Sequence, residues 1–271
     1  MTAAPFDLFL FSTDPSVIRQ TISAGAAGIV VDWERIGKRS RQASADTQVN
    51  QDTLEDLRRA RAATDATVLC RINAPHAGTP QEVEEAVQAG ADELLIPMVR
   101  TPEELQPILG LVEGRMRVGI LIETLDAVRN ASGFANLPLS RVYLGLNDLA
   151  IERRSTNIFA AVADGTVERV RRQLPHPFGF AGLTLPERGK PIPCRLLVGE
   201  MARLDCSFSF LRRSYHRDVR GKDPAREIPR ILEAMDAARA RRTEQVQADR
   251  RELLDTIETR AARTLVGDPR P

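Results

Sequence analysis

Short apolar segments alternate with amphipathic segments along most of the chain. The apolar segments are rich in Val, Ile, Leu and Phe, as expected for strands of a parallel sheet that is buried on both faces. Eight segments predict strands, at 8–11, 28–32, 67–71, 93–97, 117–122, 141–145, 179–183 and 207–211. Segments with helical period lie between them, for example at 14–24, 53–63, 80–89, 102–112 and 193–204. Because no hairpin signal separates the strands, we predict an α/β fold, a (β/α)8 TIM barrel over residues 1–223.

The remaining residues, 224–271, predict a charged helical extension. Its apolar positions recur at helical spacing: Ile228, Ile231, Leu232, Met235, Leu253, Leu254 and Ile257. Basic clusters in this extension are interleaved with Asp and Glu, which favours a solvated helix face over a nucleic-acid-binding patch. We expect the extension to pack on the barrel or to mediate homo-oligomerisation.

Residues that close the predicted strands are the candidates for chemistry. In barrels of this kind the reacting groups lie at the carboxyl ends of the strands. Most of the predicted strands end in polar residues or in proline. These residues are Asp32, Glu34, Arg71, Asn73, Pro97, Glu123, Asp148, Arg212, Arg213, Tyr215 and His216. A polar mouth lined by acids and arginine suits an oxo acid bound to a metal. The same alternation points Trp33 away from its acidic neighbours and towards a helix.

Two of these acids form a candidate metal site. Glu123 and Asp148 are about 25 residues apart, which leaves room for a crossover helix between adjacent parallel strands. Both carboxylates would then lie at one rim, an arrangement suited to Mg²⁺ or Mn²⁺, since Mg²⁺ takes one or two carboxylates and keeps positions for water and substrate oxygen. The alternative is that each acid caps the helix that follows it.

Composition narrows the class of protein. With 38 basic and 37 acidic residues the charges nearly cancel, so no net field favours nucleic acid or a membrane. Cys70, Cys194 and Cys206 lack metal-ligand spacing and cannot all pair with one another, which predicts a reducing, cytoplasmic location. The apolar run at 6–11 is too short for a membrane span or a signal sequence. We therefore expect small-molecule partners.

Five motifs follow one another in order at the predicted strand ends. They are Gly28-Ile-Val-Val-Asp-Trp-Glu, Cys70-Arg-Ile-Asn, Gly90-Ala-Asp-Glu-Leu-Leu-Ile-Pro-Met-Val, Leu121-Ile-Glu-Thr and Gly145-Leu-Asn-Asp-Leu. Together they resemble the HpcH/HpaI aldolase and citrate lyase β-subunit family, barrels of the phosphoenolpyruvate/pyruvate superfamily. The resemblance covers roughly residues 6–216.

The resemblance implies a function as well as a fold. It implies that Glu123 and Asp148 hold Mg²⁺ or Mn²⁺, and that Arg71 contacts the carboxylate or enolate oxygen of the substrate. A 2-oxo acid can chelate such an ion through its carboxylate and C2 oxygen, so the metal stabilises the charge that develops there. Arg71 would add a planar donor fork suited to oxyanions. We therefore expect a metal-dependent carbon–carbon lyase or aldolase acting through a pyruvate-type enolate, with Asp32 and Glu34 among its catalytic residues.

One position departs from the family pattern. Aldolases of this family carry a histidine directly after the strand-two Glu, and the citrate-lyase branch has Asp there, whereas this chain has Arg35. Since arginine stays protonated, it is a poor general base. Metal-bound water, His76 or His216 are the other candidates for moving the proton. Arg35 is instead a candidate for binding a second carboxylate or a phosphate of the substrate.

Other substrate-binding candidates and two alternative functions remain. Pro97 closes the fourth strand, and Gly145 and Asn147 precede Asp148 in the last motif. Leu121 stands where many aldolases of the family have Gln, which favours a citrate-lyase-like enzyme acting on thioesters of coenzyme A or of a carrier protein. The second alternative is a catalytically altered barrel that only binds an oxo acid, and Arg35 is the feature that favours it.

Overall fold

The computed structural model describes residues 5–37 and 52–266, with the side chains of the last helix described up to residue 259. Within these ranges nine parallel strands form one sheet, in the order β7-β6-β5-β4-β3-β2-β1-β9-β8. The strands are β1 Asp7–Phe11, β2 Gly28–Asp32, β3 Thr67–Arg71, β4 Glu93–Ile96, β5 Arg117–Ile122, β6 Arg141–Leu144, β7 Phe178–Phe180, β8 Gly182–Leu183 and β9 Phe208–Leu211.

The two shortest strands are halves of one barrel strand. β7 pairs with β6 and β8 pairs with β9, so together they close the sheet into a barrel. Ala181 interrupts them because its backbone is left-handed, with φ of 50°, and it cannot continue the ladder. Its carbonyl instead accepts a hydrogen bond of 2.7 Å from the Ser209 hydroxyl. The predicted strand at 179–183 is therefore present but broken, and the predicted TIM-type barrel is confirmed.

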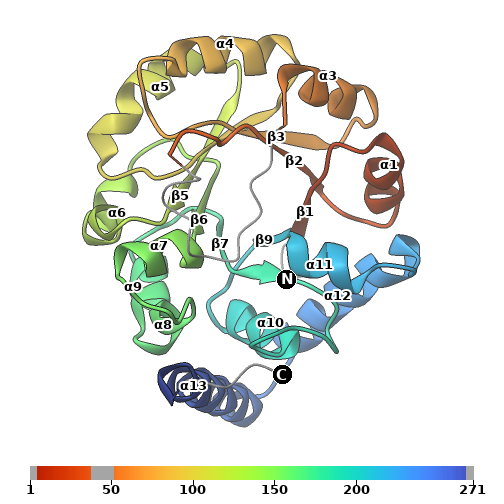
Figure 1. Cartoon of the computed structure of the whole chain (residues 1–271), viewed down its shortest axis with the longest axis vertical. Coiled ribbons are helices and arrows are strands. Elements are labelled where there is room, and N and C mark those ends of the chain that lie inside the picture. Colours follow the sequence, from red (N-terminus) through yellow and green to blue (C-terminus); the bar gives the residue numbers. More distant parts are fainter. Residues whose placement is uncertain (1–4, 38–51, 267–271) are drawn as a thin grey trace.

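Helices surround the barrel (Figure 1). They are α1 Pro15–Ser23, α3 Leu54–Ala62, α4 Thr79–Gln88, η1 Pro102–Leu105, α5 Gln106–Val112, α6 Leu125–Arg129, η2 Ala131–Phe134, α7 Leu146–Glu152, α8 Ala160–Ala163, α9 Thr166–Arg172, α10 Cys194–Arg203, α11 Arg213–Asp218, α12 Pro224–Arg239 and α13 Thr243–Val266. α12 packs against both α10 and α1 and so completes the ring, whereas α13 lies outside it against α10 and α8.

Local sequence signals start several of these helices. The Asp14 carboxylate caps α1, accepting a hydrogen bond of 2.7 Å from the Ser16 amide. Thr53 and Asp56 form a reciprocal capping box at the start of α3. Both satisfy amide groups that the first helical turn leaves without partners, and both helices begin where the periodic segments at 14–24 and 53–63 begin.

Alternation along the strands separates two cores. The inner core fills the barrel with large side chains: Phe9, Phe11, Val30, Leu69, Leu95, Leu121, Tyr143, Phe208 and Phe210. The outer core lies between barrel and helices and includes Trp33, whose ring Nε1 donates to the Thr53 carbonyl at 3.0 Å. Trp33 thus points away from its acidic neighbours, as the alternation predicts. The aromatic inner core leaves the two ends of the barrel for polar groups.

The amino-terminal end of the barrel is closed by a buried ion pair. Arg141 donates to both carboxylate oxygens of Glu93, at 2.6 and 3.1 Å, and its guanidinium lies over the rings of Phe9 and Phe208. A Cβ at Gly119 would approach both partners to 2.8 Å, so only glycine fits there. Glu93 is fully buried and Arg141 nearly so, which suits a structural plug.

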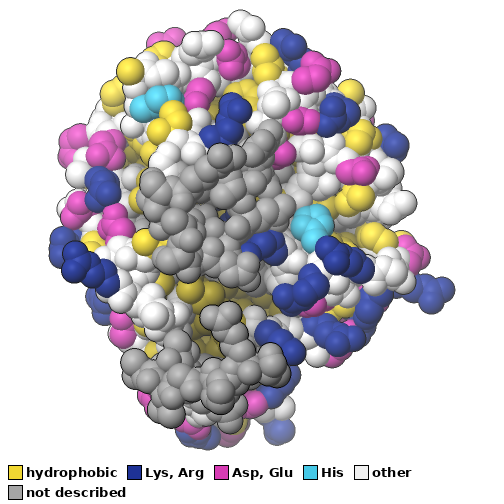
Figure 2. Space-filling model, viewed as in Figure 1, with side chains coloured by type: hydrophobic (Ala, Val, Ile, Leu, Met, Phe, Trp, Pro, Cys, Tyr) yellow, Lys and Arg dark blue, Asp and Glu magenta, His cyan; other side chains and the backbone are white. Residues whose placement is uncertain are grey.

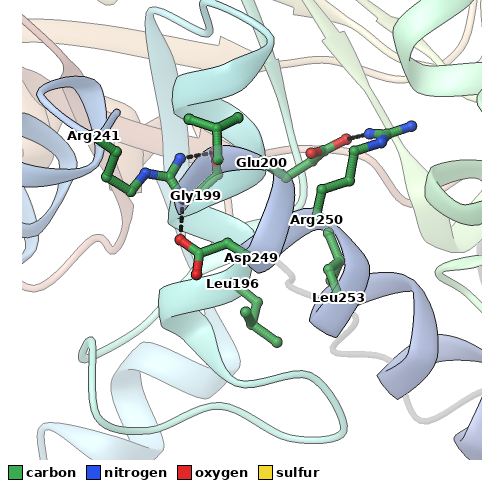
Figure 3. Close-up of a pocket in the computed structure, with 8 residues that line it drawn as sticks. Leu196, Gly199, Glu200, Arg241, Asp249, Arg250 and Leu253 are labelled. Atoms are coloured by element: carbon green, nitrogen blue, oxygen red, sulfur yellow. Dashed lines mark hydrogen bonds and ion pairs between the residues drawn. The ribbon is translucent and has the colours of Figure 1, made fainter. Parts of the chain in front are cut away.

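Polar contacts fasten α13 to α10 (Figure 3). Arg241 bonds the Gly199 carbonyl at 2.6 Å and also pairs with Asp249, while Arg250 pairs with Glu200. Leu253 and Ile257 are 1 % exposed, so the apolar side of this helix is covered by the chain's own residues. Homo-oligomerisation through the extension stays a prediction. No helix among the described residues is both long enough and apolar enough to cross a membrane.

Candidate active site

Buried charged side chains gather at the carboxyl end of the barrel. Asp32, Glu34, Arg71 and Glu123 are each no more than 3 % exposed, and Asp148 is 9 % exposed. They come from the ends of β2, β3 and β5 and from the first turn of α7. Ionic groups withdrawn from water must be compensated by one another or by a ligand, so this mouth is the candidate active site.

Arg71 is held by two acids. Its Nε and Nη2 donate to the two carboxylate oxygens of Asp32 at 2.8 and 2.6 Å, and its Nη1 lies 3.3 Å from Glu34. Burial opposes the charge, but the negative charges of Asp32 and Glu34 outweigh burial and raise the pKa of Arg71 above its usual value. A guanidinium has five N–H groups, so two remain beyond these three contacts. The two acids therefore orient a fork that can still grip an oxyanion.

The pKa of the Glu123 carboxyl is strongly perturbed. Burial raises its pKa well above the usual range, and the negative charges of Asp148 and Glu34 raise it further, while Arg71 opposes them. One of its oxygens, Oε1, accepts a hydrogen bond of 2.9 Å from the Met98 amide. Burial and the two neighbouring carboxylates thus both disfavour the charged form of Glu123.

Backbone geometry fits closely around the Glu123 side chain. Met98 has φ of 55°, a strained left-handed conformation for a residue with a side chain, and its amide is the one bonded to Glu123. On another side, a Cβ at Gly145 would lie 2.4 Å from Glu123 Oε2. Only glycine therefore lets the turn between β6 and α7 pass this carboxylate.

Helix capping does not account for either proposed metal ligand. Thr124 caps α6, its hydroxyl accepting a hydrogen bond of 3.0 Å from the Ala127 amide. The residue at the N-cap of α7 is Gly145, which has no side chain to cap with, and Asp148 lies in the first turn of that helix. The alternative from the sequence analysis is thus wrong for Glu123, and Asp148 is buried beside a second carboxylate instead of standing at the cap position.

The donor set fits a hard divalent cation. Glu123 and Asp148 offer carboxylate oxygens, which Mg²⁺ prefers, and a cation would offset the mutual repulsion that raises the pKa of Glu123. Across residues 5–37 and 52–266, no group of three or more His, Cys, Asp or Glu side chains is arranged to hold a metal ion. A cation here would therefore take two protein carboxylates and complete its coordination with water or substrate, as Mg²⁺ commonly does.

Asn73 organises the turn that follows β2. Its Oδ1 accepts hydrogen bonds from the amides of Arg35 and Ile36, at 2.7 and 2.8 Å, while its own amide groups donate to Glu82. The Arg35 side chain is exposed, because alternation puts Asp32 and Glu34 inside and position 35 outside. The backbone of Arg35 lies near the mouth through its bond to Asn73, and its side chain is exposed.

The two candidate histidines lie at different places. His76 is in the loop before α4, where its Nδ1 is 3.1 Å from the Thr79 hydroxyl and its Nε2 is 3.8 Å from Glu82. His216 is on α11, and its Nε2 is 2.7 Å from the Phe11 carbonyl. Since a carbonyl only accepts, Nε2 of His216 carries the hydrogen. Phe11 also lies against Arg71, which connects His216 to the mouth.

The remaining predicted substrate residues border the same site. Pro97 is buried between β4 and Met98, and Asn147 is half-buried beside Asp148 on α7. Sequence reasoning gave no role to Arg212, which follows β9 and places its guanidinium carbon 4.4 Å from the centre of the Phe11 ring. The sequence does carry a signal for Arg212. Phe208 and Phe210 face the inner core, and because side chains alternate along a strand, position 212 is expected to face inward too.

A hollow lies at the opposite end of the barrel. It is an open hollow of about 740 Å³ beneath β4, β5 and β6, lined by residues such as Leu109, Met116 and Arg117. None of the predicted site residues lines it. Because residues at the amino-terminal face of such barrels mainly serve stability, we assign the chemistry to the carboxyl-terminal mouth.

The protein is a parallel α/β barrel whose strand ends carry buried carboxylates around Arg71. This combination of fold and site defines its class. The family model for HpcH/HpaI aldolase/citrate lyase matches residues 6–158, and the chain belongs to that family. The resemblance read from the five motifs is confirmed. Membership supports the general kind of activity, the making or breaking of carbon–carbon bonds.

A solved structure supports the fold over nearly the whole chain. The structure titled "Crystal Structure of Citrate Synthase SbnG" aligns with a TM-score of 0.55 at 17% sequence identity, covering 91% of this chain and 95% of that one. At this identity the likeness shows the fold alone. No curated protein matches the sequence.

Proposed function

We propose that this chain is a divalent-cation-dependent carbon–carbon lyase that acts on a 2-oxo acid through its enolate. One observation carries the proposal: two buried carboxylates, Glu123 and Asp148, lie together at the barrel mouth beside an arginine that keeps spare donors. An enolate needs both elements, a cation to share its oxygens and a fixed donor for the charge that develops. Family membership supports the same kind of reaction.

Different residues of the chain bind the cation, bind the substrate oxygen and position these groups. Bound Mg²⁺ or Mn²⁺ would supply Lewis-acid stabilisation of the substrate oxygens at Glu123 and Asp148. Arg71 points its remaining N–H groups at the oxygen that gains charge, and Asp32 and Glu34 act as positioning residues by fixing its fork. The Met98 amide binds Glu123, and the backbone at Gly145 packs closely against its side chain, so Glu123 is held in one position. The acids of β2 thus act through Arg71.

The proton needs an acceptor other than residue 35. Arg35 is exposed and cationic, so it does not accept a proton. In His216 the Nε2 hydrogen is engaged by Phe11, which leaves Nδ1 of the neutral ring as an acceptor. We propose His216 as the general base for enolisation. His76 lies on the Thr79 and Glu82 side of its loop, which favours a structural role there.

Exchange of the C3 hydrogens of pyruvate in deuterated water tests the proposal. The wild-type protein should catalyse exchange with Mg²⁺ or Mn²⁺ and lose it with a chelator. Glu123→Gln and Asp148→Asn should each lower the exchange rate about 100-fold and weaken Mn²⁺ binding measured by calorimetry, since one charge-stabilising contact is worth roughly that factor. Glu123→Gln keeps an oxygen for the Met98 amide, so folding should persist.

Asp126→Asn is the matched control. Asp126 is a partly exposed acid in the first turn of α6, paired with Arg100 and Arg129, and Asp126→Asn removes one charge from outside the buried cluster. Its exchange rate should stay within about twofold of wild type, because exposed ion pairs contribute little. Unchanged Mn²⁺ affinity in both site variants, or no exchange by the wild type with any divalent ion, would refute the proposed function.

A further inference from the structure

Tyr143 is the member of the inner core whose side chain ends in a polar atom. The other members of that core are Phe, Val or Leu residues. Tyr143 is 7 % exposed, and no described residue forms a hydrogen bond with its hydroxyl. A tyrosine hydroxyl in apolar surroundings usually has a partner, because leaving it unsatisfied costs free energy. The inner core therefore carries one donor that the fold itself does not use.

Tyr143 lies one layer beneath the proposed cation site. In the ladder between β5 and β6, Tyr143 is paired with Leu121. Glu123 and Gly145 each lie two residues further along the chain, so alternation gives them the same inward direction, one layer closer to the mouth. Two residues advance a strand by about 6.6 Å, a step that a tyrosine side chain can span.

The ring of Tyr143 leans towards the carboxyl end of the barrel. Its centre is 4.5 Å from that of Phe210 and 6.1 Å from that of Phe208, and Phe210 is the nearer of these two to the end of β9. Tyr143 and Phe11 are the most exposed members of the inner core, and Phe11 ends β1 against Arg71. The open side of the inner core is thus the mouth, and Tyr143 forms part of its floor.

Electrostatic interactions of the phenol agree with this direction. Burial raises the pKa of Tyr143, and the negative charge of Glu123 raises it further, while Arg212 and Arg71 oppose the shift. These three charged groups all belong to the mouth, so the hydroxyl lies within reach of the site. Because its pKa is raised, the hydroxyl stays protonated at neutral pH, where it can donate a hydrogen bond but cannot act as a base.

We propose that Tyr143 is a catalytic residue whose hydroxyl donates a hydrogen bond to the substrate oxygen that gains charge when the enolate forms. The inference rests on the proposed function, which places the substrate oxygens beside Glu123 and Arg71. Such a hydrogen bond strengthens as the oxygen becomes more negative, so it lowers the barrier more than it improves binding of the ground state. Phenylalanine at this position would keep the ring and lose the donor.

The tyrosine offers a different kind of contact from the basic residues around the mouth. On the face shown in Figure 2, Lys and Arg side chains gather around α11, which follows β9. Arg213, Arg217 and Arg220 are exposed there. Exposed charges attract anions at a distance and are screened by salt, whereas a neutral hydroxyl acts only at contact. Salt concentration therefore separates the two contributions.

The chain offers a matched pair of variants, because it has two tyrosines. Tyr143→Phe removes the proposed donor, and Tyr215→Phe makes the same chemical change in α11. The Tyr215 hydroxyl is buried without a partner, and the charge that acts on it is Glu227 of α12. Both variants keep an aromatic ring in place, so both should unfold in urea close to the wild-type midpoint.

Oxalate is the probe for the enolate, because it is planar and carries negative charge on adjacent oxygens, whereas pyruvate represents the ground state. With Mg²⁺ present, calorimetry should show oxalate binding weakened about 10- to 100-fold in Tyr143→Phe and pyruvate binding changed less than about threefold. Pyruvate C3 exchange should fall by a factor similar to that for oxalate, through kcat instead of KM. The losses should be equal at low and high salt. Tyr215→Phe should match the wild type in each measurement.

The possible results lead to different conclusions. Unchanged oxalate affinity and exchange in Tyr143→Phe would overturn the role of Tyr143 and leave the lyase proposal standing. Equal losses for pyruvate and oxalate, or the same losses in Tyr215→Phe, would also overturn it, since the hydroxyl would then not respond to charge on the substrate. A wild type that neither binds oxalate with Mg²⁺ nor exchanges the C3 hydrogens would overturn the proposed function and this inference with it.

Discussion

Replacing Gly145 with alanine should damage the site much more than the fold. The backbone at this position has φ of −82° and ψ of 99°, an ordinary extended conformation that alanine adopts without strain. The added methyl group would lie 2.4 Å from Oε2 and 2.8 Å from Cβ of Glu123. The substitution therefore acts through a contact with one side chain.

The size of the effect follows from those distances. Carbon and oxygen atoms in ordinary contact begin near 3.4 Å, so the Glu123 carboxylate must shift by about 1 Å or the strand and turn must separate. A displacement of about 1 Å in a reacting constellation can cost roughly 100-fold in rate. Overpacking costs about 1–3 kcal/mol, partly offset by the 0.4–1 kcal/mol that Gly→Ala contributes through the unfolded chain.

Three measurements test this reasoning. Gly145→Ala should weaken Mn²⁺ binding and slow pyruvate C3 exchange by about 100-fold each, while urea unfolding shows a loss below about 3 kcal/mol. Gly110→Ala is the matched control, because Gly110 lies in α5 and a Cβ there meets nothing within 4 Å. It should leave binding and exchange unchanged. Wild-type metal affinity and exchange in Gly145→Ala would show that Glu123 is free to move, and the site would lack the close fit inferred here.

Three further predictions concern other groups. Arg71→Lys should lower kcat for the native substrate more than it raises KM, because a lysine cannot reproduce the bidentate contact; a change confined to KM would make Arg71 a substrate clamp only. His216→Gln should reduce pyruvate C3 exchange by about 100-fold or more without weakening Mn²⁺ binding, whereas His76→Gln should not. The three cysteines are buried, and burial raises the pKa of Cys194 to about 11 and that of Cys70 and Cys206 as well. A thiol-reactive dye at pH 8 should therefore react slowly with the native protein and rapidly once urea unfolds it.

The fold was predictable because its signals are local and repeated. Every predicted strand occurs in the structure, and the starts of α1 and α3 coincide with their capping residues. The break at Ala181 was not predictable, since nothing in Gly179-Phe-Ala-Gly marks alanine as the left-handed residue. That conformation is imposed by closure of the barrel, where one strand must change partners from β6 to β9.

The sequence predicted where the site residues lie better than it predicted what each of them contacts. Strand ends identified Asp32, Arg71 and Glu123, and all three meet at the mouth. Nothing in the sequence shows that Asp32 grips Arg71 with both oxygens, or that the Met98 amide bonds Glu123, because such contacts join separate strands. Arg212 was named among the strand-end residues without a role, although alternation along β9 gives it the inward direction of Phe208 and Phe210.

The two ends of the barrel show why residue type alone does not identify an active site. Each end holds a buried arginine gripped through two oxygens by an acid, Arg141 with Glu93 at one end and Arg71 with Asp32 at the other. At the amino-terminal end aromatic rings and Gly119 surround the pair.

At the carboxyl-terminal end the balance is different, because Glu34, Glu123 and Asp148 add carboxylates and Arg212 adds a cation. A pair that satisfies itself resists ligands, since any newcomer must replace contacts already made. An arrangement with like charges close together instead gains from binding ions of the opposite sign, a cation at the acids and an anion at the arginines. That imbalance, more than the presence of any one residue, is the physical basis for placing the chemistry at this end.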